Sequence, residues 1–265
     1  MDTTTPDTGT AAATARFRYI ALAVALLAGP WGFVAANGIY AWMTRHGGSD
    51  LTGAGALALA GAHPGAYRFS MVMAMFGSMI MVPAAIGAMR PTHHRAAKLG
   101  LIGGVLVAAG YICYFAMVMS DRITLAMAAH GDHLADYAKV LDDSLNGASV
   151  VWVYLTFLIG NIVGTFLLGL ALLRSRSVSA WAGWGVMGWP ILHVIGLVLS
   201  TEWLEVAGAL AQALGFASVA IYLLRQPWPG HMSRSVIDVP PGRTSASARQ
   251  QVSSGGKPSS NSATL

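Results

Sequence analysis

The sequence has few charged residues and almost no cysteine, and both shortages restrict what the chain can be. Only 10% of its 265 residues are Asp, Glu, Lys or Arg, whereas a soluble domain has about 25%. A single cysteine, Cys113, excludes a disulfide within the chain and any metal site built from several cysteines. The patterns of a nucleotide-binding P-loop, a zinc protease, a serine hydrolase and a c-type haem site are also missing. We therefore predict no cofactor and no bound metal.

Apolar residues make up most of what remains. They account for 55% of the chain, the mean hydropathy is +0.56, and 31 residues are glycines, which let membrane helices approach closely. This composition predicts an all-α, polytopic membrane protein whose first partner is the lipid bilayer. The basic pI of about 9.6 could suggest nucleic acid, but the charges lie in loops, where membrane topology explains them. No nucleic-acid partner is expected.

Six apolar segments are long enough to cross a bilayer, which needs about 20 residues of helix. They comprise residues 19–43, 66–89, 99–120, 149–173, 179–199 and 203–224. The first follows two arginines, but it is too long for the apolar core of a signal peptide, so we interpret it as an uncleaved span. The transmembrane domain is thus predicted over residues 17–225. The flanking residues 1–16 and 226–265 have too few apolar side chains to form a core and are predicted to be disordered.

The basic residues divide unequally between the two sides of the membrane that six crossings define. The side with both termini carries twelve: Arg16, Arg18, Arg90, Arg95, Lys98, Arg174, Arg176, Arg225, Arg234, Arg243, Arg249 and Lys257. The opposite side carries four: Arg45, Arg68, Arg122 and Lys139. Cytoplasmic loops are enriched in Lys and Arg. We therefore predict that both termini are cytoplasmic and that the protein lies in the cell membrane.

Two of the connections on the predicted outer side are long. Residues 44–65 are rich in Gly and Ala and are interpreted as a loop. Asp121 and Arg122 are expected to end the third span. Beyond them, residues 132–145 alternate apolar and charged side chains at helical spacing, which predicts a short amphipathic helix with Asp132 as its N-cap. Such a helix would lie on the membrane surface or cover the bundle.

Polar residues within the apolar segments predict a site. Residues three, four and seven positions apart share a helix face, and most such polar positions fall in the half of the membrane that the charges place outside. Ionisable side chains in a membrane are costly and mark functional sites, so Glu205, His193 and Asp121 are candidate catalytic residues. The candidate ligand-binding residues are aromatic or carry amides: Asn37, Tyr111, Tyr114, Tyr154, Asn161, Trp184, Trp189 and Gln212.

Structural roles explain the same residues without a ligand. Asn, Gln and Ser form hydrogen bonds between membrane helices, and Trp and Tyr gather at membrane interfaces. Glu205 lies in the first turn of its segment, where the helix dipole favours a carboxylate. His193 lies deeper and could serve only packing. The sequence leaves a pocket and a packed polar interior both open.

Two stretches carry a resemblance to known proteins. These are His63-Pro64-Gly65, followed by a helix ending near Val82-Pro83, and Leu173-Arg174-Ser175-Arg176 with Trp181 beyond it. Over residues 17–225 the chain resembles a broad group of six-helix bacterial membrane proteins, many of them actinobacterial and of unknown function. The resemblance implies a six-span layout and no catalytic residues.

Three functions fit these observations. The first is a protein that binds or exports a hydrophobic or amphipathic molecule, or gives self-resistance to it, and holds that molecule in an outward-facing pocket. Because the chain has no ATP-binding motif, transport would need a partner ATPase or an ion gradient. A transporter with only six spans would also need to form a dimer. The second is an isoprenoid cyclase or isomerase with Glu205 as its general acid and aromatic faces around a carbocation. The third is a structural or signalling component that meets a partner through residues 132–145.

Overall fold

A computed structural model describes residues 8–145 and 147–226 of the chain. Residues Arg16–Gln226 form one compact unit. The disorder predicted for residues 1–7 and 227–265 lies outside the described residues. The compact unit contains the site discussed below.

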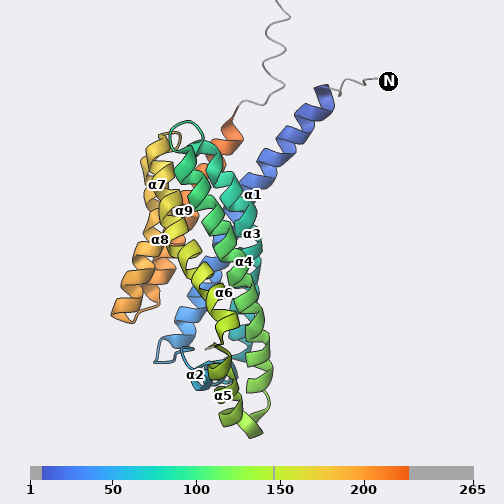
Figure 1. The fold of residues 1–265 in the computed structure, drawn as a ribbon, viewed down its shortest axis with the longest axis vertical. Helices are drawn as coiled ribbons and strands as arrows, with labels where there is room; N and C mark the ends of the chain where they lie inside the picture. Colours follow the sequence, from blue (N-terminus) through green and yellow to red (C-terminus); the bar gives the residue numbers. More distant parts are fainter. Residues whose placement is uncertain (1–7, 146, 227–265) are drawn as a thin grey trace, which may run out of the picture. The chain divides into compact units, whose positions relative to one another are not determined.

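Six helical segments in the described part of the chain are long and apolar enough to cross a membrane, and the described residues contain no strand. The segments are Ala13–Thr44, Pro64–Thr92, Ala97–Ala128, Val150–Ser175, Ala180–Leu199 and Trp203–Arg225. They correspond to α1 (Thr8–Thr44), α3 (Pro64–Met89), α4 (Ala97–Ala128), α6 (Ala148–Leu158) with α7 (Thr165–Ser175), α8 (Ala180–Leu199) and α9 (Trp203–Arg225) (Figure 1). The predicted all-α, six-span membrane architecture is confirmed.

Two helices extend further than the sequence predicted. α1 begins at Thr8, within the stretch for which disorder was expected, and it continues through Pro30. α4 continues to Ala128, so the prediction that Asp121 and Arg122 end the third span was wrong. Charged side chains do not break a helix; they only mark the end of its apolar part, and the backbone hydrogen bonds continue beyond them.

The fourth span contains an irregular turn that the sequence did not reveal. Between α6 and α7 lies a π-helix, η3 (Ile159–Gly164). Here the backbones of two helices nearly touch, since a Cβ built on Gly110 of α4 would lie 2.9 Å from the Cα of Gly160 in η3. Close backbone approach through small residues is a common mode of helix packing in membranes. Isolated π turns recur at functional sites, and Asn161 is part of this one.

The connection over residues 44–65, predicted to be a loop, contains the helix α2 (Gly53–Ala62). Thr52 caps it, because its hydroxyl accepts a 3.1 Å hydrogen bond from the Gly55 amide. The predicted amphipathic helix is present as α5 (Leu134–Leu145), but Asp132 lies in a preceding 3₁₀ turn, Gly131–His133, rather than at an N-cap. α2 and α5 pack together at one end of the bundle, where the Gly53 amide donates a 2.7 Å hydrogen bond to Asp142 Oδ1 (Figure 1). Of the two positions expected for this helix, α5 therefore packs against other parts of the protein, namely α2, α4 and α6.

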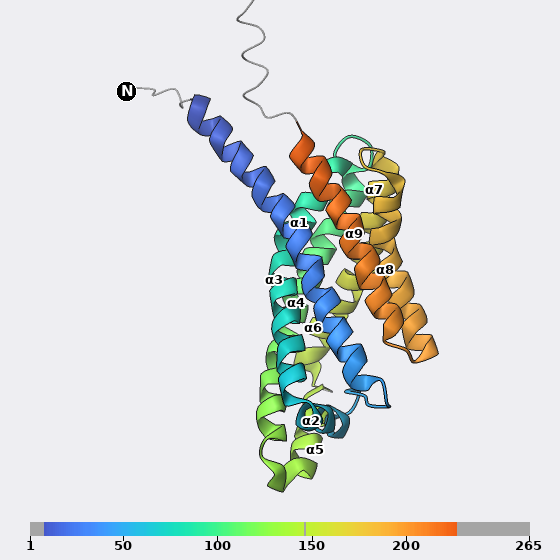
Figure 2. The ribbon, with the colours of Figure 1, turned by 180° about the vertical axis from the view of Figure 1, so that it is seen from behind.

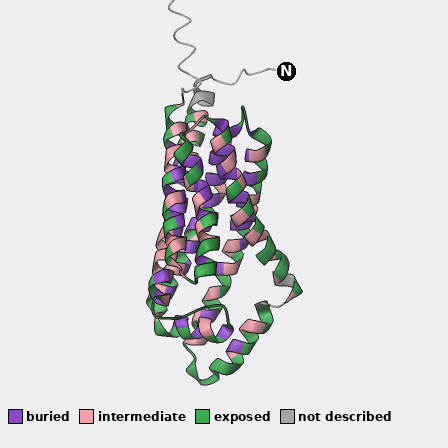
Figure 3. Ribbon diagram, turned by 90° about the vertical axis from the view of Figure 1, so that its left-hand side faces the viewer, coloured by how far each residue is buried: buried purple, intermediate pink, exposed green. Residues whose placement is uncertain are grey.

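The spanning helices pack as neighbouring pairs. α3 lies against α4, α7 against α8, and α8 against α9, whereas α4 also contacts α6, η3 and α7 (Figure 2). Fully buried side chains from several helices meet in one core: Leu26, Met81, Val107, Leu168, Leu172, Val186, Phe216, Val219 and Leu223. Buried positions follow the inner faces of the helices and exposed ones the outer faces (Figure 3). Many exposed residues are large and apolar, as expected of a surface that faces lipid.

Candidate functional site

A small cavity of about 30 Å³ lies among five of the spanning segments. Each of four segments contributes two side chains three or four residues apart, as a shared helix face requires. The lining residues are Phe33 and Asn37 from α1, Tyr111 and Tyr114 from α4, Phe157 and Asn161 from the fourth span, Trp189 and His193 from α8, and Glu205 from α9. The cavity therefore depends on the packing of every spanning segment except α3.

The two titratable groups of the cavity are in contact. His193 Nδ1 lies 3.3 Å from Glu205 Oε1, and the side chains are only 19% and 22% exposed. The contact depends on the tight link between α8 and α9, where Ser200 adopts a left-handed conformation (φ 52°) and ends α8. α9 begins three residues later at Trp203 and brings Glu205 back beside α8. The pair becomes an ion pair whenever the imidazole is protonated.

Aromatic rings form the rest of the wall. Trp189 stacks on His193, with ring centroids 5.0 Å apart and an interplanar angle of 12°. Tyr114 stacks on Phe157 at 4.7 Å, and Phe33 lies 4.9 Å from Tyr111. Aromatic faces carry negative charge density and attract cations. With a carboxylate beside them, these rings favour a positively charged group over an anion.

One polar atom of the cavity wall lacks a partner among the described residues. Asn161 Oδ1 is buried and makes no hydrogen bond. A buried amide without a partner costs about 1–3 kcal/mol. A cavity of about 30 Å³ with polar groups in its wall is large enough for a water molecule or a group of that size. The site thus has room and hydrogen-bonding capacity for a water or for one small polar head group.

The structure brings together seven of the eleven side chains selected from the sequence. These are Asn37, Tyr111, Tyr114, Asn161, Trp189, His193 and Glu205. Gln212 is buried one layer away, within reach of Tyr111. Trp184 and Tyr154 are 60% and 50% exposed and do not line the cavity. Phe157 was missed, although its position four residues before Asn161 places it on the same helix face.

Asp121, the third catalytic candidate, does not line the cavity either. Its side chain lies beside the Tyr67 hydroxyl, which joins α4 to α3. Nearby, the Tyr40 hydroxyl donates a 2.6 Å hydrogen bond to Asp50 Oδ1. Asp121 therefore belongs to a group of carboxylates and tyrosines that borders the cavity without lining it.

Glu202 adds a second carboxyl beside Glu205, in the link outside the spanning segments. Burial, together with the neighbouring charge of Glu205, raises the pKa of Glu202 to about 7. Asp50 contributes in the same direction, and His193 opposes it. The folded protein therefore holds the Glu202 proton more tightly than an isolated glutamic acid would.

Among the described residues, no group of three or more His, Cys, Asp or Glu side chains is arranged to hold a metal ion. Comparisons of the chain with models of protein families, with curated proteins and with solved structures found no match. The residues of the cavity are accordingly the basis for a functional assignment.

Proposed function

We propose that this membrane protein binds a small amphipathic molecule at the cavity between Glu205, His193 and the aromatic rings, in a role of export or self-resistance. The single observation that supports this proposal most is the contact of His193 with Glu205 at an aromatic-walled cavity. A carboxylate retained inside an apolar bundle is costly. The presence of the Glu205 carboxylate beside the cavity is explained if it binds a ligand that enters the cavity.

The size of the cavity favours a particular kind of ligand. Pockets for drug-sized molecules occupy about 300–1,000 Å³, far more than the 30 Å³ found here. A primary ammonium group is about as large as a water molecule, and it donates three hydrogen bonds. Glu205 and the Asn161 carbonyl oxygen would accept two of them, and the rings of Tyr114 and Trp189 would face the positive charge. The apolar remainder of the ligand would lie outside the cavity, between the helices or in lipid.

A cationic head group would compete with His193 for the Glu205 carboxylate. His193 Nδ1 lies 3.3 Å from Glu205 Oε1, and an ammonium group in the cavity would take over this contact. Because the chain has no ATP-binding pattern, movement of such a ligand across the membrane would need an ion gradient or a partner ATPase.

Binding of dodecylamine tests the proposal. Radiolabelled dodecylamine would be titrated onto the full-length protein in detergent by scintillation proximity, with dodecanol as an uncharged competitor of equal chain length. We expect Glu205→Gln to weaken binding about ten-fold or more, because a hydrogen bond to a charged group contributes roughly 1.5–3 kcal/mol. Dodecanol should compete poorly.

Asp136→Asn is the matched control, since it also removes one carboxylate but from a side chain that is 88% exposed. It should bind dodecylamine as the wild type does. If the wild type and Glu205→Gln bound dodecylamine with equal affinity, Glu205 would not contact the ligand and the proposal would be wrong.

The alternative predicted from the sequence, an isoprenoid cyclase with Glu205 as acid, uses the same carboxylate and aromatic rings. A cyclase encloses its whole substrate away from water, which a cavity of about 30 Å³ supports less well than a head-group site. Product formation from an isoprenoid diphosphate or epoxide in membranes, lost in Glu205→Gln at unchanged expression, would favour the enzyme.

We also propose that both termini are cytoplasmic and that the protein lies in the cell membrane, with the cavity toward the outer side. The distribution of twelve basic residues against four supports this orientation. In the same orientation, His193 and Glu205 lie toward the end of α8 and the start of α9 that face outward. A ligand would then reach the cavity from the outer leaflet or from outside the cell.

A further inference from the structure

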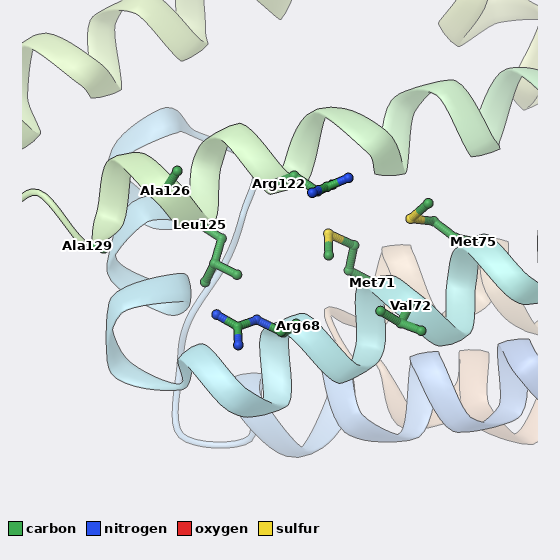
Figure 4. A pocket seen from close by; sticks show the side chains of 8 residues that line it. All are labelled: Arg68, Met71, Val72, Met75, Arg122, Leu125, Ala126 and Ala129. Carbon is green, nitrogen blue, oxygen red and sulfur yellow. The ribbon is translucent and has the colours of Figure 1, made fainter.

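A second and larger hollow lies apart from the cavity, between α3 and α4. Its volume is about 540 Å³, within the range of ligand pockets. Figure 4 shows the side chains of both helices that border it. The lining residues are Arg68, Met71, Val72 and Met75 from α3, and Arg122, Leu125, Ala126 and Ala129 from α4 and its end. None of them lines the cavity of Glu205 and His193.

Two arginines give this groove its charge. Arg68 and Arg122 come from opposite walls, and both side chains extend into the space between the helices (Figure 4). Both residues are exposed, and no carboxylate among residues 8–145 and 147–226 lies within salt-bridge distance of either guanidinium. Two like charges that face one groove repel each other unless an anion lies between them. A guanidinium presents a planar set of donors that matches a phosphate group.

The position of the arginines fits the level of a lipid headgroup. Arg68 is the fifth residue of α3, and Arg122 lies six residues before the end of α4. At about 1.5 Å per residue, each is within roughly 10 Å of its helix end. Because α3 and α4 are consecutive and antiparallel spans, these two ends lie on the same side of the membrane. Arginine near a helix end extends its charge toward the interface.

The remaining walls are apolar and adaptable. Met71, Val72 and Met75 follow the groove along α3 away from Arg68. Across the groove on α4, Leu125 lies opposite Arg68 and Arg122 lies opposite Met71 (Figure 4). Methionine side chains are flexible and fit irregular apolar partners. A soluble anion would gain nothing from the apolar residues, whereas an acyl chain would cover them. The groove therefore offers two guanidinium groups on opposite walls together with an apolar surface along α3.

We propose that the groove between α3 and α4 is a binding site for a phospholipid with an anionic headgroup. The phosphate lies between Arg68 and Arg122, and an acyl chain packs along Met71, Val72 and Met75. The lipid joins two helices that also carry Tyr67 and Asp121, so it stabilises the end of the bundle where that group of carboxylates and tyrosines lies.

Native mass spectrometry of the full-length protein in detergent tests the site. The protein would be titrated with palmitoyl-oleoyl phosphatidylglycerol or, in a parallel series, with the zwitterionic phosphatidylcholine of the same chains. We expect a first phosphatidylglycerol to bind at least about ten-fold more tightly than phosphatidylcholine. The double variant Arg68→Gln/Arg122→Gln should lose this preference, because it removes both charged donors. Equal binding of the two lipids by the wild type would overturn the proposal.

Arg45→Gln is the matched control. Arg45 lies directly after the end of α1, where its guanidinium covers the Trp42 ring and donates to the Trp42 carbonyl. It should retain the full preference, and an equal loss in Arg45→Gln and the double variant would show a general charge effect and contradict the site.

A second variant tests the apolar part and does not depend on the double variant folding. Val72→Trp would fill the groove from an exposed position while both arginines remain, and we expect it to weaken phosphatidylglycerol binding several-fold. The proposal would be contradicted if Val72→Trp bound phosphatidylglycerol as tightly as the wild type and if inorganic phosphate displaced the lipid at millimolar concentration. Those two results together would indicate a site for free anions.

Discussion

At the scale of single residues, the site depends on polar groups that the helices bring into an apolar bundle. Glu205 and His193 are partly buried and face each other at 3.3 Å. Neither would be stable there alone, since an unpaired charge in hydrocarbon is costly. The contact between them lowers the cost of burying both groups. The Asn161 carbonyl oxygen, which has no hydrogen-bond partner, remains able to accept a hydrogen bond from a ligand.

The Glu202 carboxyl should make stability depend on pH. Its pKa is about 7 in the folded protein and about 4.5 in the unfolded chain, so the folded protein holds this proton more tightly. The contribution is therefore fully present below about pH 4.5 and is lost as the pH rises through about 7. The thermal unfolding midpoint in detergent should fall between pH 5 and pH 8, and Glu202→Gln should reduce that fall.

The exposed carboxylate of Asp143 provides the comparison. Asp143→Asn should show the same fall in unfolding midpoint as the wild type over this pH range. A Glu202→Gln variant with an unchanged dependence on pH would show that Glu202 does not titrate between the two states.

At the scale of the elements, the fourth span decides how the site is built. The π turn of η3 interrupts the regular repeat between α6 and α7, and it carries Asn161 to the cavity. The close contact of Gly160 with Gly110 holds this turn against α4. Helices that touch through glycine are sensitive to any added atom, because protein interiors tolerate little extra volume.

Gly160→Ala should therefore destabilise the bundle. Its Cβ would lie 2.6 Å from the Cα of Gly110, where the backbone cannot give way easily. We expect a loss of about 1–3 kcal/mol in the free energy of unfolding, measured by SDS denaturation in mixed micelles. Dodecylamine binding should weaken as well, since Asn161 would move with the turn.

Gly38→Ala is the control for helix propensity. A Cβ at Gly38 meets no atom within 4 Å, so this variant should be as stable as the wild type or more stable by up to about 1 kcal/mol. The proposed role of the Gly160 contact is untenable if both alanine variants unfold alike.

At the scale of the whole molecule, the six spanning segments form one all-α membrane bundle, and α2 and α5 pack together at one end of it. Two separate hollows border its helices, one acidic and aromatic and the other basic and apolar. They suit head groups of opposite charge. The proposed orientation places both on the outer side of the membrane.

Cysteine labelling tests that orientation in intact cells. The single native cysteine, Cys113, is buried and gives little background. His130→Cys, exposed in the connection after α4, should react with a membrane-impermeant maleimide, whereas His94→Cys, exposed between α3 and α4, should react only after lysis. The reverse pattern would place the termini outside the cell and turn the cavity toward the cytoplasm.

The sequence by itself determined the number of spanning segments and most of the residues that line the cavity. Backbone groups in hydrocarbon must be satisfied within a helix, so apolar length alone predicts the spans. Helical periodicity then places pairs such as Tyr111 and Tyr114, or Trp189 and His193, on single faces. Apolar length and helical periodicity depend only on residues close together in the chain, so the sequence is enough to predict them.

Only the tertiary structure decided which faces meet. The π turn at Asn161 is held by the contact of Gly160 with Gly110 of α4, and α2 packs against α4 and α5. The same contacts excluded Trp184, Tyr154 and Asp121 from the cavity and brought His193 to Glu205. The physical reason is that helix periodicity fixes directions around one axis, whereas the rotation and spacing of separate axes are set by packing between them.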